Sequence, residues 1–196
     1  MFIVLDVESL LYGKPYNIGY IIADKGGNIY KQDNVAILAN ISKVSAPAFR
    51  ILSDTDKPRK DRQFHILTNE GFKRQFFKDL KNYNIDTIYT FTNFDKARLN
   101  TLFDISVKFI DIRPMILNVL PDRYIKFCFK NNFITSKGNI RTNAETIYRY
   151  LTKNPDFKEE HIGLPDAQIE FEMLMKVIKW KKKSGKKSYT DLMKRA

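Results

Sequence analysis

The strongest constraint on the fold is the apolar run Phe2–Leu5, which two acidic residues, Asp6 and Glu8, follow at once. An apolar run without alternation is typical of a strand buried on both faces, so it predicts a central strand. Because successive side chains of a strand point to opposite faces, Asp6 and Glu8 should share one face. Two neighbouring carboxylates repel each other, and burying them is costly unless a cation is bound. The pair indicates either a metal site or, if the strand ends at Leu5, two solvated acids.

The next segments predict an antiparallel start to the sheet. Residues 16–24 and 28–38 are typical of strands, and the glycines between them favour a hairpin. From Asn40 to Leu67 the pattern weakens, which predicts a surface loop or a short helical excursion.

Beyond that stretch, strand and helix patterns alternate, which implies parallel strand pairings. Strands are expected over 85–91 and 107–112, and helices over 68–84, 95–103, 122–132, 143–152 and 164–183. Thr68 or Asn69 would cap the first of these helices. The fold class is therefore α/β, with a mixed sheet whose first three strands are antiparallel and whose later strands are parallel, and with helices packed on it.

Composition narrows the possible partners. The 196 residues favour one domain, and 34 Lys and Arg against 22 Asp and Glu give a net charge of +12. Such a field concentrates polyanions, so nucleic acid is the first partner to consider, although the excess charge could serve only solubility. Cys128 is the single cysteine, which excludes an internal disulfide and multi-cysteine zinc sites; we expect a buried thiol. We expect no membrane segment and a cytoplasmic location, or the interior of a host cell.

Two further acids stand where α/β folds collect functional groups. Asp95 follows a predicted strand and Asp166 lies in the first turn of the last helix. Either could merely favour a helix N-terminus. His161 stands five residues before Asp166, and an imidazole, whose unperturbed pKa is about 6.5, suits proton transfer. The other interpretation of His161 is an exposed loop histidine paired with Glu159 or Glu160. We expect His65, the second histidine, to be structural or on the surface.

Three stretches together resemble the motifs of the DEDDh 3′→5′ exonucleases, a family of the ribonuclease H-like fold that includes proofreading subunits and ribonuclease T. "FIVLDVES" resembles the first motif through Asp6 and Glu8, "YTFTNFD" the second through Asp95, and "HIGLPDAQIE" the third through His161 and Asp166. The motifs occur in the family's order, and the stretch before the third is similar to bacterial and phage-type members.

The resemblance covers residues 1–183, which would form the exonuclease domain, followed by a basic tail over 184–196. Three positions depart from the family's pattern. Ser9 stands where threonine is common, Phe91 where asparagine is common, and Gly163 where alanine is frequent. We expect the last to be a small change that leaves His161 mobile but placed.

The resemblance implies a metal-dependent 3′→5′ exonuclease acting on single-stranded ends, DNA more than RNA. Asp6, Glu8, Asp95 and Asp166 would hold two divalent cations, Mg²⁺ or Mn²⁺, and His161 would be the general base. The alternatives are a nucleic-acid-binding module that no longer cleaves and an RNA-trimming exoribonuclease. The acids nearest to His161 and beyond Asp166 are interpreted as bystanders: Glu159, Glu160, Glu170 and Glu172.

The resemblance also implies that Ser9, Leu10 and Leu11 contact the terminal nucleotide, although both leucines could equally be core. The basic segments 57–62 and 179–187 could follow a phosphate backbone or form solvated faces. The expected partner is a single-stranded 3′ end, and a polymerase or another replication protein is a possible protein partner.

Overall fold

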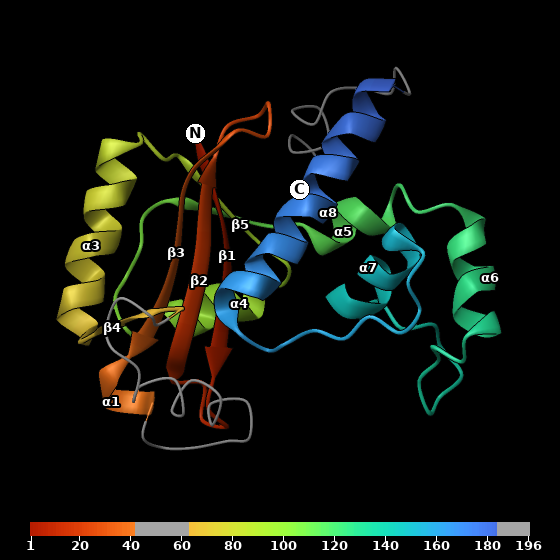
Figure 1. Cartoon of the computed structure of the whole chain (residues 1–196), viewed down its shortest axis with the longest axis horizontal. Coiled ribbons are helices and arrows are strands. Elements are labelled where there is room, and N and C mark those ends of the chain that lie inside the picture. The colour runs from red at the N-terminus through yellow and green to blue at the C-terminus, as the bar shows by residue number, and fades with distance from the viewer. Residues whose placement is uncertain (42–62, 184–196) are drawn as a thin grey trace. The chain divides into compact units, whose positions relative to one another are not determined.

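The computed structural model describes residues 1–41 and 63–183. Within these ranges six strands form one sheet in the order β4-β3-β2-β1-β5-β6 (Figure 1). The strands are β1 (Phe2–Ser9), β2 (Pro15–Ala23), β3 (Ile29–Ile37), β4 (His65–Leu67), β5 (Thr87–Thr90) and β6 (Lys108–Asp111). β1, β2 and β3 pair antiparallel, whereas β5 pairs parallel with both β1 and β6. The predicted mixed sheet is confirmed.

Helices occupy all five segments where helical spacing predicted them, and two short helices, over Leu38–Ile41 and Arg113–Leu117, were not among those predicted. The helices are α1 (Leu38–Ile41), α3 (Asn69–Asn82), α4 (Asn93–Leu99), α5 (Arg113–Leu117), α6 (Asp122–Lys130), α7 (Ala144–Thr152) and α8 (Gly163–Lys183). Thr68 caps α3, because its side chain accepts a hydrogen bond from the backbone of Gly71 at 3.0 Å. The helix expected over 95–103 ends earlier, at Leu99, where the Thr101 hydroxyl donates to the carbonyl of Arg98 and the chain turns.

The stretch from Asn40 to Leu67 contains a strand that we did not predict. β4 pairs parallel with β3 at the edge of the sheet, through residues His65–Leu67. Three residues are too few to show a period, so this pairing has no local signature. His65 is 58% exposed on this edge strand, as a surface histidine would be. The basic segment 57–62 lies outside the described residues.

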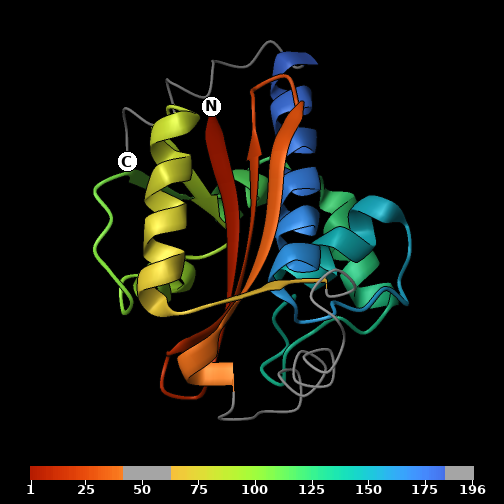
Figure 2. The same cartoon turned by 60° about the vertical axis from the view of Figure 1, so that its left-hand side comes forward.

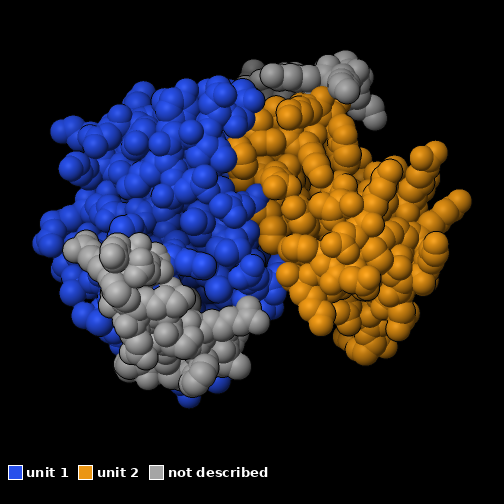
Figure 3. Space-filling model, viewed as in Figure 1, with its two compact units in different colours: residues 1–111, 159–168 blue, residues 112–158, 169–196 orange. Residues whose placement is uncertain are grey.

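The described chain divides into two compact units, which Figure 3 draws in different colours. Unit 1 comprises residues 1–111 and 159–168, and unit 2 comprises residues 112–158 and 169–196. Helix α8 gives its first residues to unit 1 and the others to unit 2. In the part of the chain that the structure describes, no helix has the length and apolar character that crossing a membrane requires.

The core of unit 1 lies between the sheet and α3. Ile3, Leu5 and Val7 of β1 point to this face, where they join Phe72 and Phe76 of α3 in one buried cluster. Figure 2 shows the strands between α3 on one side and the first turn of α8 on the other. Because strand side chains alternate, the even-numbered residues of β1 point away from α3. The two acids of β1 are therefore on the face of the sheet opposite to this core.

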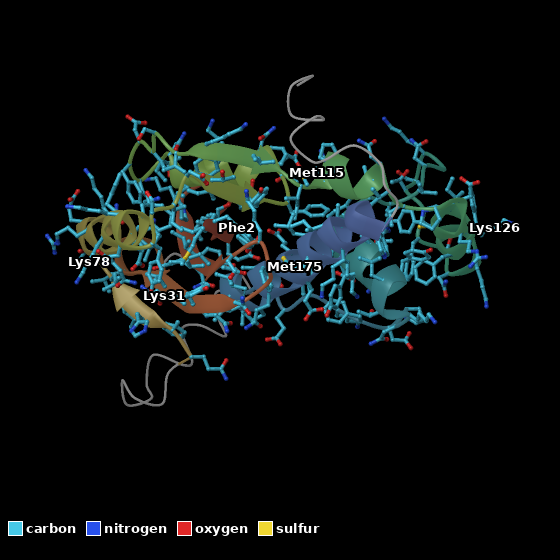
Figure 4. The ribbon with its side chains drawn as sticks, turned by 90° about the horizontal axis from the view of Figure 1, so that it is seen from above. Phe2, Lys31, Lys78, Met115, Lys126 and Met175 are labelled. Carbon is cyan, nitrogen blue, oxygen red and sulfur yellow. The ribbon has the colours of Figure 1, made fainter. Side chains whose placement is uncertain are left out.

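An ion network joins β3 to α3. Lys31 lies with its Nζ 2.5 Å from Asp79 Oδ2 and 3.3 Å from Asp33 Oδ2, and the Tyr20 hydroxyl donates to Asp79 at 2.6 Å. Figure 4 labels Lys31 on β3 and Lys78 on α3, the residue before Asp79. Both aspartates are buried, and a buried ion pair holds two elements in register because removing one partner would leave an uncompensated charge.

Candidate active site

Asp6 and Glu8 lie where the sheet changes from antiparallel to parallel pairing. In the β1–β2 register Asp6 is opposite Gly19 and Glu8 is opposite Asn17. On its other side β1 pairs with β5 only as far as Val4, so the last part of β1 has no partner strand there. Such a switch point leaves an opening at the carboxyl ends of the strands, where α/β sheets place their ligands.

Helix α4 brings Asp95 to this opening. Thr92 caps the helix by accepting from the amide of Phe94 at 3.3 Å, and its hydroxyl donates to Asp95 Oδ2 at 3.4 Å. Asp95 is buried in the first turn. One turn later, Arg98 donates to the carbonyl of Val7 at 3.2 Å and lies 3.8 Å from Asp95 Oδ1. The arginine thus ties α4 to the end of β1 and places a positive charge beside the acids.

A contact between two glycines brings the start of α8 to the same place. A Cβ on Gly19 would lie 2.0 Å from the backbone carbon of Gly163, and a Cβ on Gly163 would lie 2.3 Å from the nitrogen of Gly19. The amide of Gly163 also donates to Asn17 Oδ1 at 2.7 Å. Since Gly19 pairs with Asp6, this contact places the first turn of α8 beside the acids of β1. The glycine at position 163, where alanine is frequent in the family, is therefore more than a small change, because an alanine would not fit here.

His161 and Asp166 flank this contact. Asp166 is buried, with its amide bonded to the carbonyl of Ile162. His161 has a left-handed backbone with φ 54°, which histidine adopts more readily than most residues. Its imidazole is 56% exposed, and Nδ1 lies 3.9 Å from Glu8 Oε1. Candidate ligand atoms of Glu8, His161 and Asp166 all lie within 4.8 Å of one another.

The pKa values of the four carboxyls are raised, which shows that Arg98 does not offset their burial and mutual repulsion. Burial raises the pKa of Asp6 well above its usual value, and the charges of Asp95, Glu8 and Asp166 raise it further. Burial raises the pKa of Asp166 to about 8, with added repulsion from Glu159 and Glu8. At neutral pH Asp166 would therefore hold a proton unless a bound cation replaced it.

The pKa values of the two remaining carboxyls, Asp95 and Glu8, are also raised, although neighbouring groups act to lower them. Burial raises the pKa of Asp95 to about 6, although Arg98 acts against it. Burial also raises the pKa of Glu8, while His161, Arg98 and hydrogen bonds act to lower it. The five predicted residues thus come together in one part of unit 1.

The donor atoms fit a hard divalent cation. Asp6 Oδ2 and Asp166 Oδ1 are buried and accept no hydrogen bond from the described part of the chain. A buried carboxylate oxygen without a donor costs free energy, which coordination to an ion would remove. Mg²⁺ and Mn²⁺ prefer oxygen ligands, and carboxylates are the oxygen donors that Asp6, Glu8, Asp95 and Asp166 offer.

A hollow of about 600 Å³ lies in unit 1 at the end of β1. Ser9, Leu10, Leu11, Phe94 and Arg98 line it. Leu11 is 98% exposed, so the core interpretation of this leucine is wrong, whereas Leu10 packs partly against a buried cluster. Phe94 is 68% exposed with the Arg98 guanidinium 5.9 Å from its ring centre. All three residues expected to contact substrate therefore border one open space.

Sequence reasoning missed three contributors to this site. Asn17 and Gly19 position α8, and a glycine inside the largely apolar strand β2 was a signal of close backbone approach. Glu159 was interpreted as a bystander, but its charge raises the pKa of both Asp6 and Asp166. Its effect depends on the path of the chain before α8, which no local pattern predicts.

Comparisons with known proteins bear on the fold. No family model matches the chain, and no curated protein matches it significantly. Among solved structures, the crystal structure of cell-death related nuclease 4 (CRN-4) is similar, with a TM-score of 0.52 and 13% identity. The likeness covers 91% of this chain, and the chain spans 64% of that nuclease. The fold is ribonuclease H-like. At this identity the likeness shows the fold alone.

Proposed function

We propose that this protein is a divalent-metal-dependent 3′→5′ exonuclease that acts on single-stranded nucleic-acid ends, DNA more than RNA. The observation that carries the proposal is the cluster of four carboxyls with raised pKa values, two of which have buried oxygens without a donor. Such a cluster is unfavourable by itself and favourable around cations. The fold shared with a nuclease supports it, as does the net charge of +12, which suits a polyanionic substrate.

Asp6, Glu8, Asp95 and Asp166 would hold the metal. A pair of bound divalent ions supplies Lewis-acid polarisation of the phosphodiester and neutralises the charge that develops on its oxygens. The role of the four carboxylates would be to hold these ions in place. His161 is the residue suited to move a proton, because its ring is exposed beside Glu8 and can accept a proton from an attacking water.

The hollow at the end of β1 would receive the terminal nucleotide. The Ser9 hydroxyl can donate to the 3′ end, and the exposed Leu11 can pack against the last base. Phe94 offers a further apolar face, and Arg98 offers a cation for a phosphate oxygen. Membership of the DEDDh family, of its bacterial or phage-type branch, and any protein partner stay predictions.

The test is digestion of matched single-stranded DNA and RNA oligonucleotides of one sequence. With a 5′ label and Mg²⁺ or Mn²⁺, we expect a ladder that shortens from the 3′ end, faster for DNA, and no products in EDTA. Asp6→Ala and His161→Ala should each lower kcat by a factor of about 100 or more. Asp86→Asn, which changes an exposed acid of unit 1, is the matched control and should digest like the unmodified protein.

The proposal fails if neither metal supports digestion of either oligonucleotide by the folded protein. Binding without cleavage would favour the module that keeps the fold but no longer cuts. Faster digestion of the RNA would reassign the substrate and leave the chemistry in place.

A further inference from the structure

A second hollow lies entirely within unit 2. Residues of α6, α7, the loop after α7 and the later part of α8 enclose about 680 Å³. This volume is in the range of small-ligand sites, which run from roughly 300 to 1,000 Å³. None of the residues proposed for catalysis belongs to this unit.

Three aromatic side chains line the hollow: Phe127, Tyr150 and Trp180. Tyr150 is held by edge-to-face contacts with Phe127 and with Tyr124, at ring-centre distances of 5.4 and 5.3 Å. Trp180 is 36% exposed, although an indole buries a large apolar area when it can. The hollow thus has a firm aromatic wall with an indole left open to a ligand.

Three basic side chains line the same hollow: Arg123, Lys130 and Lys153. All three are exposed, and none of the described residues that line the hollow is acidic. Residues 112–158 contain nine Lys and Arg against three Asp and Glu, so this segment carries half of the chain's net charge of +12. The potential at the hollow is therefore positive, and no neighbouring carboxylate in its lining compensates it.

Aromatic faces beside cations recognise one chemical class well. A nucleobase stacks on an aromatic ring whatever its sequence, and the phosphates that flank it pair with lysine and arginine. A purely apolar ligand would form no ion pair with the basic side chains, and a free phosphate would not stack on the aromatic rings. We propose that the hollow of unit 2 is an anchoring site for a nucleotide of single-stranded nucleic acid, with the base against Trp180 and the phosphates at Lys130 and Lys153. This goes beyond the proposed function, because binding here requires neither the acidic cluster nor cleavage.

The chain provides its own probe of this site, since Trp180 is its single tryptophan. The full-length protein in EDTA, where no hydrolysis occurs, is titrated with single-stranded oligothymidylate. We expect saturable quenching of the indole fluorescence and an affinity that falls as salt rises. Inorganic polyphosphate has the charge but no bases, so it should leave the fluorescence unchanged.

Variants then separate stacking from charge. With a labelled oligothymidylate followed by anisotropy, Trp180→Ala should bind about tenfold more weakly. Lys130→Ala should weaken binding and lower the slope of log affinity against log salt by about one. Lys137→Ala removes an exposed lysine of the same unit outside the hollow and should bind like the unmodified protein. Melting curves check that each variant is folded.

The proposal is overturned if oligothymidylate binds without changing the indole fluorescence, or if folded Trp180→Ala binds as tightly as the unmodified protein. Equal losses for Lys130→Ala and Lys137→Ala would overturn it as well, since binding would then follow overall charge. Absence of binding in EDTA has the same consequence. The proposed nuclease activity is judged separately, by hydrolysis of a small chromogenic phosphodiester, which Trp180→Ala should leave unchanged.

Discussion

Replacing Asp95 with asparagine should stabilise the protein when divalent cations are removed. Asp95 is 5% exposed, and burial raises the pKa of its carboxyl from 3.8 to about 6. Its pKa is thus higher in the folded than in the unfolded chain. The stability that this group contributes is fully present below pH 3.8 and is lost as the pH rises through about 6. At pH 8 the metal-free protein therefore bears the whole cost of a buried charge, which an asparagine side chain lacks.

The size of the effect follows from the change in pKa. A difference of about two pH units at about 1.4 kcal/mol each corresponds to about 3 kcal/mol. The carboxylate also accepts hydrogen bonds from the backbone at the start of α4, and an amide oxygen replaces only part of them. That loss subtracts about 1 kcal/mol. Asp95→Asn should therefore raise the free energy of unfolding by about 2 kcal/mol at pH 8 in EDTA.

Urea unfolding followed by circular dichroism measures this directly. At pH 4 the gain of Asp95→Asn should shrink to near zero, because both proteins then carry a neutral side chain. Asp86→Asn, at an exposed position, should show no such pH dependence. With saturating Mg²⁺ the order should reverse, since only the unmodified site gains from binding, by about 2.7 kcal/mol at a hundred times Kd. A variant that is less stable than the unmodified protein at pH 8 in EDTA would refute the reasoning.

Three further outcomes test the fold. Gly19→Ala would place a carbon 2.0 Å from the backbone of Gly163, so it should lower Tm and abolish digestion. In Gly71→Ala the nearest neighbour of the added carbon is the Thr68 hydroxyl at 3.2 Å, so this variant should lower Tm far less and still digest. Thr68→Ala removes the cap of α3 and should cost about 1 kcal/mol in urea unfolding with kcat unaltered; a lower kcat would contradict a purely structural role. Cys128 is buried and burial raises the pKa of its thiol, so a thiol reagent should react only after denaturation, and rapid labelling of the folded chain would disprove this.

Local patterns predicted most of the elements but not how they meet. The uninterrupted apolar run of β1 identified a central strand, because burial on both faces requires it. The motifs singled out Asp6 and Asp166 by residue type and spacing. Their approach in space depends on the register that sets Asp6 opposite Gly19 and on the contact between Gly19 and Gly163, which are properties of distant pairs.

The sequence was least informative at positions where apolar residues are exposed and polar residues are buried. On β3, Ile29 and Tyr30 are exposed whereas Asp33 is buried, because the hydrogen-bonding partners of Asp33 are polar groups on other elements. Hydrophobic periodicity predicts only which apolar residues are buried, so it could not predict the buried polar network around Lys31. The short strand β4 was missed for a related reason: its pairing depends on an edge of β3 that is distant in the sequence.

The contact between β2 and the start of α8 also leads us to expect a particular order of folding. Asn17 and Gly163, which it joins, are 146 residues apart, whereas β1, β2 and β3 form from neighbouring segments of the chain. Closing a long loop costs more conformational entropy than closing a hairpin, so we expect the hairpins to form first. We then expect Asp166 to reach Asp6 and Glu8 only in a late step. The repulsion among these acids would then oppose only the last step of folding, in which the carboxyls come together. Divalent cations should therefore accelerate the last phase of refolding and leave the first phase unchanged.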